Sequence, residues 1–413
     1  MVIRDPVHGD IDIPGALVPV MDSPTFQRLR RIRQLGTSHL VYPGALHTRF
    51  DHSLGTVHMA QGILAGLERN GEPVDASLRL VILAAALLHD VGHVAFGHTF
   101  EDERALFPRH DTPARVAMAL ERPDVKAALG TLAADVAALL GATALPAGVP
   151  PWARRIVAGP VDADLLDYLR RDAYFTGLRL TYDERVLKSL VIHAGVLAAD
   201  ATRHGQLRPD IHTELVQLLR MRYVLTERVY LHHAKVIAGA MIARAVEEAA
   251  EGGLTLADMF PLGDEALLEL LARRAGGARD LICDVVDRRL LKRAWEVSPL
   301  HIPADRRVKI EALMAEVRPR RDLERELART AGARAVIVHF PPPPVFREAD
   351  LPILTPRGLV RLPEMSEEAA GLSARYRELW RASVFAPAEQ ASRVRSLVEE
   401  VTGVASRHAP TAP

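Results

Sequence analysis

An apolar stretch of the chain ends abruptly in a group of ionisable side chains. Residues 81–88, Val-Ile-Leu-Ala-Ala-Ala-Leu-Leu, are followed at once by His89 and Asp90, and His93 and His98 come soon after. An ionisable group inside a protein is costly unless a metal ion, an opposite charge or a hydrogen bond compensates for it. Three histidines and one aspartate so close together therefore indicate a functional site at the end of a buried helix.

Composition excludes several classes of protein. The chain has 413 residues, of which 48% are hydrophobic and 25% charged. These values are typical of a globular protein with one large domain and an appendage, or with two domains. The formal net charge is zero and only 5% of the residues are aromatic, so we do not expect the protein to bind nucleic acid.

The cysteine content and the apolar runs suit a reducing compartment. Cys283 is the only cysteine, so no disulfide can form within the chain. The first residues lack the apolar core of a signal peptide, and the run before His89 is far shorter than the ~18 residues that span a membrane. We expect a cytoplasmic protein without a membrane segment.

Helical periodicity dominates residues 1–250, whereas strand-like patterns follow residue 260. We expect helices over Asp51–Leu67, Leu80–His89, a stretch that starts at Trp152, Asp162–Asp172, Ile211–Ala250 and Glu389–Val401. We expect strands within Ala335–Phe340, Leu351–Leu362 and Ala382–Ala386. The sequence therefore predicts a mainly α protein, with a helical core over residues 1–255 and a smaller α+β lobe over residues 256–413.

The histidines are concentrated near the apolar run. Eight of the seventeen lie between His39 and His110. On its own, the His89–Asp90 doublet is typical of a hydrogen-bonded pair in a core helix. His52 at the start of one helix and Asp164 at the start of another favour a metal site. Imidazoles with carboxylates suit Mn, Fe, Zn, Co or Ni better than Ca.

Residues 162–172 carry charge on one helical face. Asp164, Asp167, Tyr168 and Arg171 are spaced i, i+3, i+4 and i+7 and share that face, while leucines occupy another. A charged face is usually solvated. The same residues would also suit a pocket for a sugar and a phosphate.

The order of these motifs resembles a known family. His52, His89–Asp90 and Asp164 match the signature of the HD-domain phosphohydrolases, and the match is closest to their deoxynucleoside triphosphate (dNTP) triphosphohydrolase branch. Within that branch the chain resembles the catalytic core of the animal members that join a sterile-alpha-motif domain to an HD domain. The matching segments are Asp5-Pro-Val-His-Gly9, Phe26-Gln-Arg-Leu-Arg30, Gln34-Leu-Gly36, Tyr42-Pro-Gly44, Arg49-Phe-Asp-His-Ser-Leu-Gly55, His89-Asp-Val-Gly-His93 and Asp164 through Asp172.

The resemblance implies a fold and a reaction. The fold would be an HD-domain helical bundle with a metal at its centre, held by His52, His89, Asp90 and Asp164. The metal would be one or two divalent ions, either one of the transition metals above or Mg. Water would attack the α-phosphorus of a dNTP and release a deoxynucleoside and triphosphate.

The resemblance also assigns roles to other residues. The predicted catalytic residues are Arg49, His93, His98 and His110, of which Arg49 would hold a phosphate and His98 would protonate the departing 5′-oxygen. The predicted substrate-binding residues are Gln34, Leu35, Tyr168, Asp172 and Lys235. Arg49 could instead form an ion pair with Asp51, and Tyr168 could be core packing.

One position departs from the family pattern. The family carries a phosphate-binding lysine directly after its last metal aspartate, and this chain has Leu165 there. Losing that cation removes a contact of about 1.5 to 3 kcal/mol. A nucleoside mono- or diphosphate phosphatase is therefore the nearest alternative, and a nucleotide-gated binding protein with little turnover is another. A cyclic-dinucleotide phosphodiesterase or an alarmone pyrophosphohydrolase is a weaker alternative.

A regulatory site is a further implication of the resemblance. Asp22, Gln27 and Arg30 fall where the animal members bind an activating guanine nucleotide between subunits. We therefore expect a homo-oligomer, either a dimer or a tetramer, with a nucleotide activator. The same segment is also consistent with an ordinary amphipathic helix.

Overall fold

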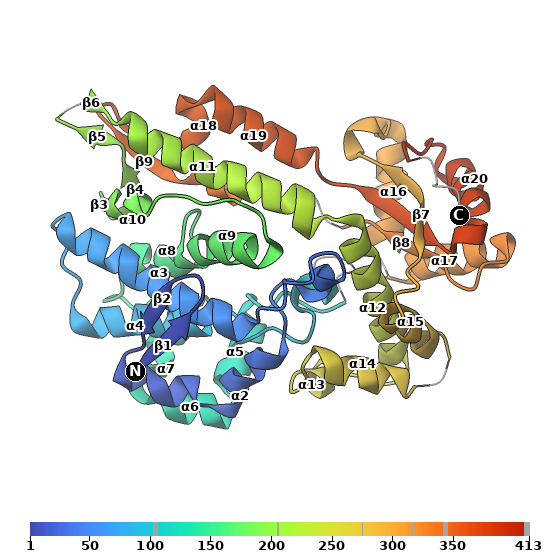
Figure 1. Ribbon diagram of the computed structural model, residues 1–413, viewed down its shortest axis with the longest axis horizontal. Helices are drawn as coiled ribbons and strands as arrows, with labels where there is room; N and C mark the ends of the chain where they lie inside the picture. Colours follow the sequence, from blue (N-terminus) through green and yellow to red (C-terminus); the bar gives the residue numbers. More distant parts are fainter. Residues whose placement is uncertain are drawn as a thin grey trace.

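A bundle of helices forms the first part of the chain in the computed structural model (Figure 1). The structure describes residues 1–101, 104, 106–204, 206–274, 276–315, 317–341 and 346–408. The first part contains β1 (Val2–Asp5), β2 (Gly9–Asp12), α1 (Val18–Met21), α2 (Pro24–Gln27), α3 (Arg49–Arg69), α4 (Ala76–Leu88), α5 (Pro113–Leu120), α6 (Pro123–Leu129), α7 (Ala133–Leu139), α8 (Pro151–Val157), α9 (Ala163–Thr176), α10 (Arg185–Lys188), α11 (Pro209–Leu225) and α12 (His233–Glu251). Short 3₁₀ turns include η2 (Arg28–Arg31), η3 (Gly36–Leu40) and η4 (Gly97–Phe100).

Strands become frequent after residue 190. The remaining elements are β3 (Leu190–His193), β4 (Val196–Asp200), β5 (Thr202–Arg203), β6 (Gln206–Leu207), α13 (Leu256–Met259), α14 (Asp264–Ala272), α15 (Gly277–Val286), β7 (Lys292–Val297), α16 (Ala304–Ala315), α17 (Val317–Ala331), β8 (Ile337–His339), η8 (Arg347–Asp350), β9 (Pro352–Thr355), β10 (Gly358–Arg361), α18 (Leu362–Met365), α19 (Glu367–Arg377), β11 (Ala382–Ala386) and α20 (Ala391–Thr402). Helices outnumber strands over the residues that the structure describes, which confirms the prediction of a mainly α protein.

Capping residues mark the starts of α3 and α4, two of the three helices whose ends carry the predicted metal ligands. A capping box starts α3: the Thr48 hydroxyl accepts from the Asp51 backbone N–H, and the Asp51 carboxylate accepts from the Thr48 backbone N–H. Asp75 is the N-cap of α4, and its side chain accepts from the backbone N–H groups of Ser77 and Leu78. Both predicted helices are confirmed, and α4 ends at the residue before His89.

Helix α9 packs closely against α3. At Gly55 of α3, a Cβ atom would lie 1.8 Å from Asp167 Oδ1 and 2.5 Å from Arg171 Nη2. Only a glycine allows this approach. Asp167 and Arg171 are therefore buried against α3 rather than solvated, and Leu165 and the other leucines of α9 are buried in the core as well.

The helix expected over Ile211–Ala250 is interrupted. A π-helical turn, η6 (Thr226–Tyr230), follows α11, and His232 then adopts an extended conformation and caps α12. The prediction of one continuous helix is wrong because Leu231 and His232 leave the helical path without a proline or glycine to signal the break. The interruption brings Tyr230 to Asp172, to which its hydroxyl donates at 2.5 Å.

Two sheets organise the second part of the chain. The order β7-β11-β8 forms an antiparallel sheet, and the order β10-β9-β4-β3 forms a second sheet in which β4 and β9 are parallel. The three strand regions predicted after residue 335 are confirmed, whereas β3, β4 and β7 were not predicted. Since β9 pairs with β4, the second sheet joins residues from both sides of the predicted boundary at residue 255, which stays a prediction.

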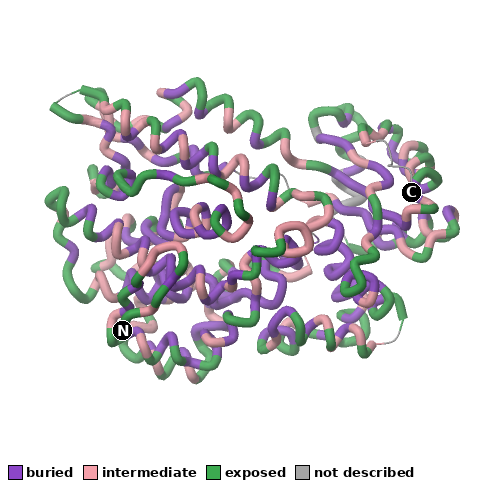
Figure 2. The backbone as a smooth tube through the Cα atoms, in the orientation of Figure 1, coloured by how far each residue is buried: buried purple, intermediate pink, exposed green. Residues whose placement is uncertain are grey.

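The structure has two hydrophobic cores, one in the helical bundle and one beside the β7-β11-β8 sheet. The larger core fills the helical bundle and extends to α14 and α15. The smaller core lies between the β7-β11-β8 sheet and helices α17 and α20, around the fully buried Trp295. Figure 2 shows buried residues concentrated where these elements meet. Across the described ranges, none of the helices combines the length and the apolar character that a bilayer span requires.

Candidate metal centre and active site

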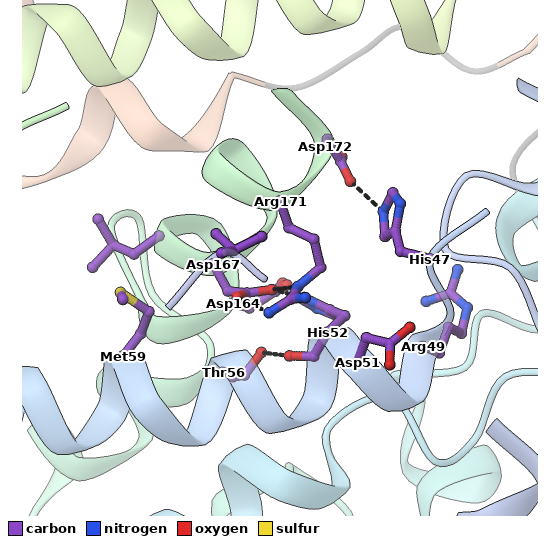
Figure 3. A network of polar contacts seen from close by, with 12 residues as sticks. His47, Arg49, Asp51, His52, Thr56, Met59, Asp164, Asp167, Arg171 and Asp172 are labelled. Carbon is purple, nitrogen blue, oxygen red and sulfur yellow. Dashed lines mark hydrogen bonds and ion pairs between the residues drawn. The ribbon is translucent and has the colours of Figure 1, made fainter. Parts of the chain in front are cut away.

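The four predicted metal ligands converge from three helices. His52 lies in the first turn of α3, His89 and Asp90 directly follow α4, and Asp164 lies in the first turn of α9. One ligand atom each from His52, His89 and Asp90 lies within 4.8 Å of the others. Asp164 Oδ1 lies 2.8 Å from His52 Nε2 and 3.7 Å from His89 Nε2. Figure 3 shows His52 and Asp164 pointing toward each other between α3 and α9.

The hydrogen bonds of the two histidines fit a divalent ion. His89 Nδ1 donates to the Ala86 carbonyl oxygen at 2.8 Å, and His52 Nδ1 donates to Asp167 Oδ2 at 2.7 Å. Each neutral ring then presents the lone pair of its Nε2 atom, and these two atoms lie 3.1 Å apart. Two facing lone pairs require a cation between them, so the donor set suits a metal.

The surrounding carboxylates strengthen this preference for positive charge. With no ion bound, burial lowers the pKa of His52, but hydrogen bonds to Asp164 and Asp167 outweigh it and raise that pKa to about 10. His52 then carries a proton, which a metal ion would displace on binding the neutral ring. Burial likewise raises the pKa of Asp90, yet the nearby Arg49 guanidinium holds it well below its usual range. The carboxylate of Asp90 therefore stays ionised.

A chain of buried ion pairs orients His52 from behind. Arg171 donates to both oxygens of Asp167 at 2.8 and 3.0 Å, and to Asp5 Oδ2 at 2.8 Å. His8, in the turn between β1 and β2, lies 2.6 Å from Asp167 Oδ1. The amino-terminal hairpin thus contacts Asp167, which orients the His52 ring. The Asp5-Pro-Val-His-Gly9 segment therefore supports the metal group through Asp5 and His8.

Arg49 pairs with a predicted metal ligand. Its Nη1 atom donates to Asp90 Oδ2 at 2.5 Å, and the side chain is buried. Asp51, the partner considered from the sequence, instead caps α3 through Thr48. A Cβ atom at Gly97 would lie 2.2 Å from Arg49 Nη2, so the turn at Gly97 covers the guanidinium closely.

The three other predicted histidines form a second group, which also borders Asp90. The rings of His93 and His110 stack with centroids 3.6 Å apart, and His98 meets both edge-on. Their ligand atoms also lie within 4.8 Å of one another, so this group has the geometry for a second ion. His93 Nε2 lies 3.2 Å from Asp90 Oδ1, which connects the two groups.

A carboxylate missed by sequence reasoning supports this histidine group. Glu101 is buried, its Oε2 lies 2.9 Å from His110 Nδ1, and His98 Nδ1 is 3.5 Å from the same oxygen. Burial raises the pKa of Glu101, but His93 and hydrogen bonds from His110 and His98 outweigh it and lower that pKa far below its usual range. The only available signal was the spacing of His98 and Glu101 within one turn.

Buried arginines fix the backbone that carries His93. Arg28 donates to the carbonyl oxygens of His93 and Val91 at 2.7 and 2.8 Å, and Arg115 donates to that of Gly92 at 2.7 Å. Burial lowers the pKa of Arg28 to about 9, helped by neighbouring arginines. Sequence reasoning missed both arginines, because their partners are backbone atoms far along the chain.

Two predicted substrate residues of α9 lie in a separate polar cluster. Asp172 accepts from His47 Nε2 at 2.9 Å as well as from Tyr230, and Figure 3 shows its pairing with His47. The Tyr168 hydroxyl donates to Glu348 at 3.4 Å, and the Arg222 guanidinium lies 5.2 Å from the Tyr168 ring. Four members of this cluster were not predicted: His47, Arg222, Tyr230 and Glu348.

The other predicted substrate residues border η3 and α12. Gln34 Oε1 is buried and has no hydrogen-bond partner among the residues that the structure describes, and Leu35 beside it is 8% exposed. The carbonyl of Lys235 accepts from the Thr37 hydroxyl at 2.9 Å, which joins η3 to α12. An unpartnered buried acceptor such as Gln34 Oε1 is typical of a group that awaits a ligand.

The predicted regulatory residues lie together on another part of the fold. Gln27 accepts from Arg30 at 2.8 Å and donates to the Met21 carbonyl at 2.9 Å. The Arg30 guanidinium stacks on the Phe50 ring at 3.5 Å, and Asp22 is exposed at the end of α1. The segment forms α2 and η2 rather than one amphipathic helix.

Comparison with protein families identifies the core. The HD domain model matches residues 49–140, and the HD associated region model matches residues 215–411. An uncharacterized protein of Methanocaldococcus jannaschii is 31% identical over 402 residues, which cover 95% of this chain and 81% of that protein. The uncharacterized protein YwfO of Bacillus subtilis is 30% identical, over 71% of this chain and 70% of its own.

Relatives with a named activity and solved structures agree with this result. The deoxynucleoside triphosphate triphosphohydrolase SAMHD1 of Gallus gallus is 28% identical over 78% of this chain, which spans 61% of that enzyme. The crystal structure of a phosphohydrolase from Bacteroides thetaiotaomicron covers 94% of this chain and 100% of its own, with a TM-score of 0.71 at 23% identity, and shows the same fold. The chain therefore belongs to the HD-domain family, and it is a metal-dependent phosphohydrolase.

Proposed function

We propose that the protein is a dNTP triphosphohydrolase, which releases a deoxynucleoside and intact triphosphate. The observation that carries the proposal is the arrangement around Asp90. The group of His52, His89, Asp90 and Asp164 meets the histidine group with Glu101 at this residue, because His89 Nε2 and His93 Nε2 lie 3.6 and 3.2 Å from the same oxygen, Asp90 Oδ1. Similarity to the chicken triphosphohydrolase over 78% of this chain supports the choice of substrate.

The metal group and Arg49 form the phosphate end of the proposed site. His52, His89, Asp90 and Asp164 hold a divalent ion, which supplies Lewis-acid activation of the phosphoryl group and of water when bound. Arg49 keeps its contact with Asp90 through one nitrogen, and its planar fork leaves further N–H donors for a phosphate oxygen. The buried guanidinium is thus oriented before a substrate arrives.

The histidine group supplies the proton in this proposal. Water attacks the α-phosphorus, the bond from phosphorus to the 5′-oxygen breaks, and the departing oxygen takes a proton. His98 donates that proton, because its side chain is 46% exposed while Glu101 lies behind it at 3.5 Å. His93 and His110 complete the group, and burial lowers the pKa of His93 well below its usual value, so His93 stays neutral.

The nucleoside end uses residues of α9 and the two residues before η3, and Lys235 of α12 lies close to η3. Asp172, oriented by His47 and Tyr230, accepts a hydrogen bond from the 3′-hydroxyl. Tyr168 packs on the sugar, Gln34 and Leu35 contact the base and sugar, and Lys235 binds phosphate. The buried and unpartnered Gln34 Oε1 supports this arrangement, because a base amino group would satisfy it.

Leu165 favours a second candidate, a nucleoside mono- or diphosphate phosphatase. Its side chain is 3% exposed and packs in the larger core, so it offers no charge to a phosphate tail. The products separate the candidates. A triphosphohydrolase releases triphosphate, a phosphatase releases single phosphates, and a nucleotide-gated binding protein releases neither.

The test is a product assay by ion-exchange chromatography. Each dNTP is incubated with Mn, Mg, Co or Fe and the wild-type protein, Asp164→Asn, or Asp305→Asn as an exposed control. The proposal expects deoxynucleoside and triphosphate from the wild type and the control, and neither from Asp164→Asn. Release of phosphate from nucleoside monophosphates without dNTP turnover would replace it with the second candidate.

We further propose a homo-oligomer, either a dimer or a tetramer, with a nucleotide activator at Asp22, Gln27 and Arg30. The stacking of Arg30 on Phe50, next to Arg49 in α3, would connect an activator to the metal group. GTP or dGTP should then raise the turnover of a second dNTP in the wild type and not in Arg30→Ala. Unchanged wild-type rates at saturating GTP would refute the regulatory role.

A further inference from the structure

Asp264 is a fully buried carboxylate that holds two backbone segments at once. It is the first residue of α14, and its side chain is 0% exposed. Its Oδ1 accepts from the backbone N–H of Phe96 at 2.7 Å, and its Oδ2 accepts from that of Arg33 at 2.9 Å. These segments lie 168 and 231 residues away along the chain, and each leads directly into residues of the proposed site.

The first segment is the turn that precedes His98. Phe96 has a φ of 59° and Gly97 a φ of 55°. A left-handed conformation is unfavourable for a residue with a Cβ atom such as Phe96, so the surroundings must hold it there. Gly97 covers the Arg49 guanidinium, and His98 follows at once. The hydrogen bond from Phe96 to Asp264 therefore holds the turn that packs Gly97 on Arg49 and leads into His98.

The second segment leads into Gln34. A Cβ atom at Gly263 would lie 2.5 Å from Arg31 Cβ and 2.6 Å from the Arg31 oxygen, so the start of α14 packs directly on this segment. Arg33 pairs with Thr48 in an isolated β-bridge, and the Gln34 backbone N–H donates to the His47 oxygen at 3.0 Å. Asp264 thus anchors the segment that carries Gln34 beside the residues that start α3.

Keeping the buried Asp264 side chain ionised lowers the free energy of unfolding, which a neutral side chain would not do. Burial raises the pKa of Asp264 to about 6, although both backbone donors and the Arg33 guanidinium at 3.6 Å favour the ionised form. At neutral pH the chain therefore carries a poorly solvated charge. Proteins retain such groups where position matters more than stability.

We propose that Asp264 is a positioning residue for the reaction. It keeps the turn before His98 and the segment that carries Gln34 at a fixed position relative to each other. The inference rests on the proposed function, because it assumes that both segments contact the nucleotide. Asp264 touches neither substrate nor metal ligands in this role. It acts through the backbone at Phe96 and at Arg33.

The matched pair of variants for the test is Asp264→Asn and Glu265→Gln. Asparagine keeps the shape but has one acceptor oxygen, so its NH₂ group must face one of the two backbone N–H donors. Glu265 is the next residue of α14, is exposed, and pairs with Arg33 only through its side chain. The Glu265→Gln variant therefore shows the effect of removing a nearby charge while the hydrogen bonds from Asp264 to the backbone remain.

The readouts are steady-state kinetics on dNTPs, metal content, and hydrogen exchange of the backbone at 20 °C. Asp264→Asn should lower kcat by about 10- to 100-fold, because displacing a positioned group by 1 Å has effects of that order. Its metal content should match the wild type, and exchange should accelerate in residues 31–35 and 94–100 but not in α3. Glu265→Gln should retain kcat within about twofold.

Each outcome decides a different point. An active wild type together with unchanged kcat and unchanged exchange in Asp264→Asn would overturn the positioning role and leave the proposed function intact. Accelerated exchange throughout the chain, with kcat per folded molecule unchanged, would assign Asp264 a purely structural role and overturn the inference as well. A wild type that turns over no dNTP would refute the proposed function, and the inference with it.

Discussion

The metal group and the histidine group share Asp90 but are built in different ways. His52, His89 and Asp164 lie at the ends of α3, α4 and α9, where helix caps and the close approach at Gly55 place them. The histidine group lies on a loop and a turn, and distant side chains hold it in place: Arg28, Arg115 and Asp264.

The loop after the histidine turn has an anchor of its own. The buried Arg104 donates to Glu324 of α17 at 2.9 Å and to Glu247 of α12 at 2.7 Å. Two residues from the second part of the chain therefore lie on either side of His98 and Glu101: Asp264 binds the Phe96 backbone, and Glu324 binds the Arg104 side chain. We infer that metal binding depends on the bundle alone, whereas proton transfer depends also on the second part of the chain.

The largest expected effect follows the loss of a metal ligand. His89→Ala should lose both bound metal and activity, the latter on the order of 10³-fold or more, because the ion supplies several kcal/mol of transition-state stabilisation. Metal content measured by mass spectrometry beside the product assay checks this. A variant with full activity and less than a tenth of the wild-type metal would contradict the assignment.

Removing the proposed acid should separate the two groups. His98→Asn should retain metal while kcat falls by about 10²- to 10⁴-fold, because a positioned general acid contributes that much. The same two assays apply. Equal loss of metal in His98→Asn and His89→Ala would show that the two groups form one site. The metal group would then not bind its ion independently of the histidine group.

A pH titration of stability should expose the charge held by Asp264. Its pKa is about 6 in the folded protein, against 3.8 ordinarily, because of burial. The stabilising effect of the protonated form is therefore complete below pH 3.8 and is lost as the pH rises through 6. The free energy of unfolding of the wild type, relative to Asp264→Asn, should fall by about 2.4 kcal/mol between pH 4 and pH 7.

Denaturant unfolding at several pH values measures this difference, since all other titrating groups are common to both proteins. Parallel stability curves across the range would mean that Asp264 is not held as a costly buried charge. The positioning role would then rest on the two backbone hydrogen bonds of Asp264 alone.

The smallest effect concerns the support behind the metal group. Asp167→Asn should weaken metal affinity by about 10- to 100-fold, because Asp167 orients His52 without contacting the ion. Competition with a chelator measures the change, and Asp183→Asn, exposed on the surface, is the control. Unchanged affinity would indicate that the His52 ring is fixed by packing alone.

The two groups also differ in how far the sequence predicts them. The apolar run before His89, the apolar periodicity after Asp51 and the charged face of residues 162–172 are local patterns, and they predicted the helices that bring the metal group together. Glu101, Asp264 and Arg28 follow no local pattern, because their roles arise only when distant segments meet. The β3–β4 hairpin was missed because its turn, Ala194-Gly195, is an uncommon signal in a helical region.

The proposed function requires that water attacks the α-phosphorus of a dNTP at the metal group. Hydrolysis in ¹⁸O-labelled water, with mass analysis of both products, tests this step. We expect the label to enter triphosphate and the deoxynucleoside to stay unlabelled. Label in the deoxynucleoside, or in free monophosphate released stepwise from the γ-position, would contradict it.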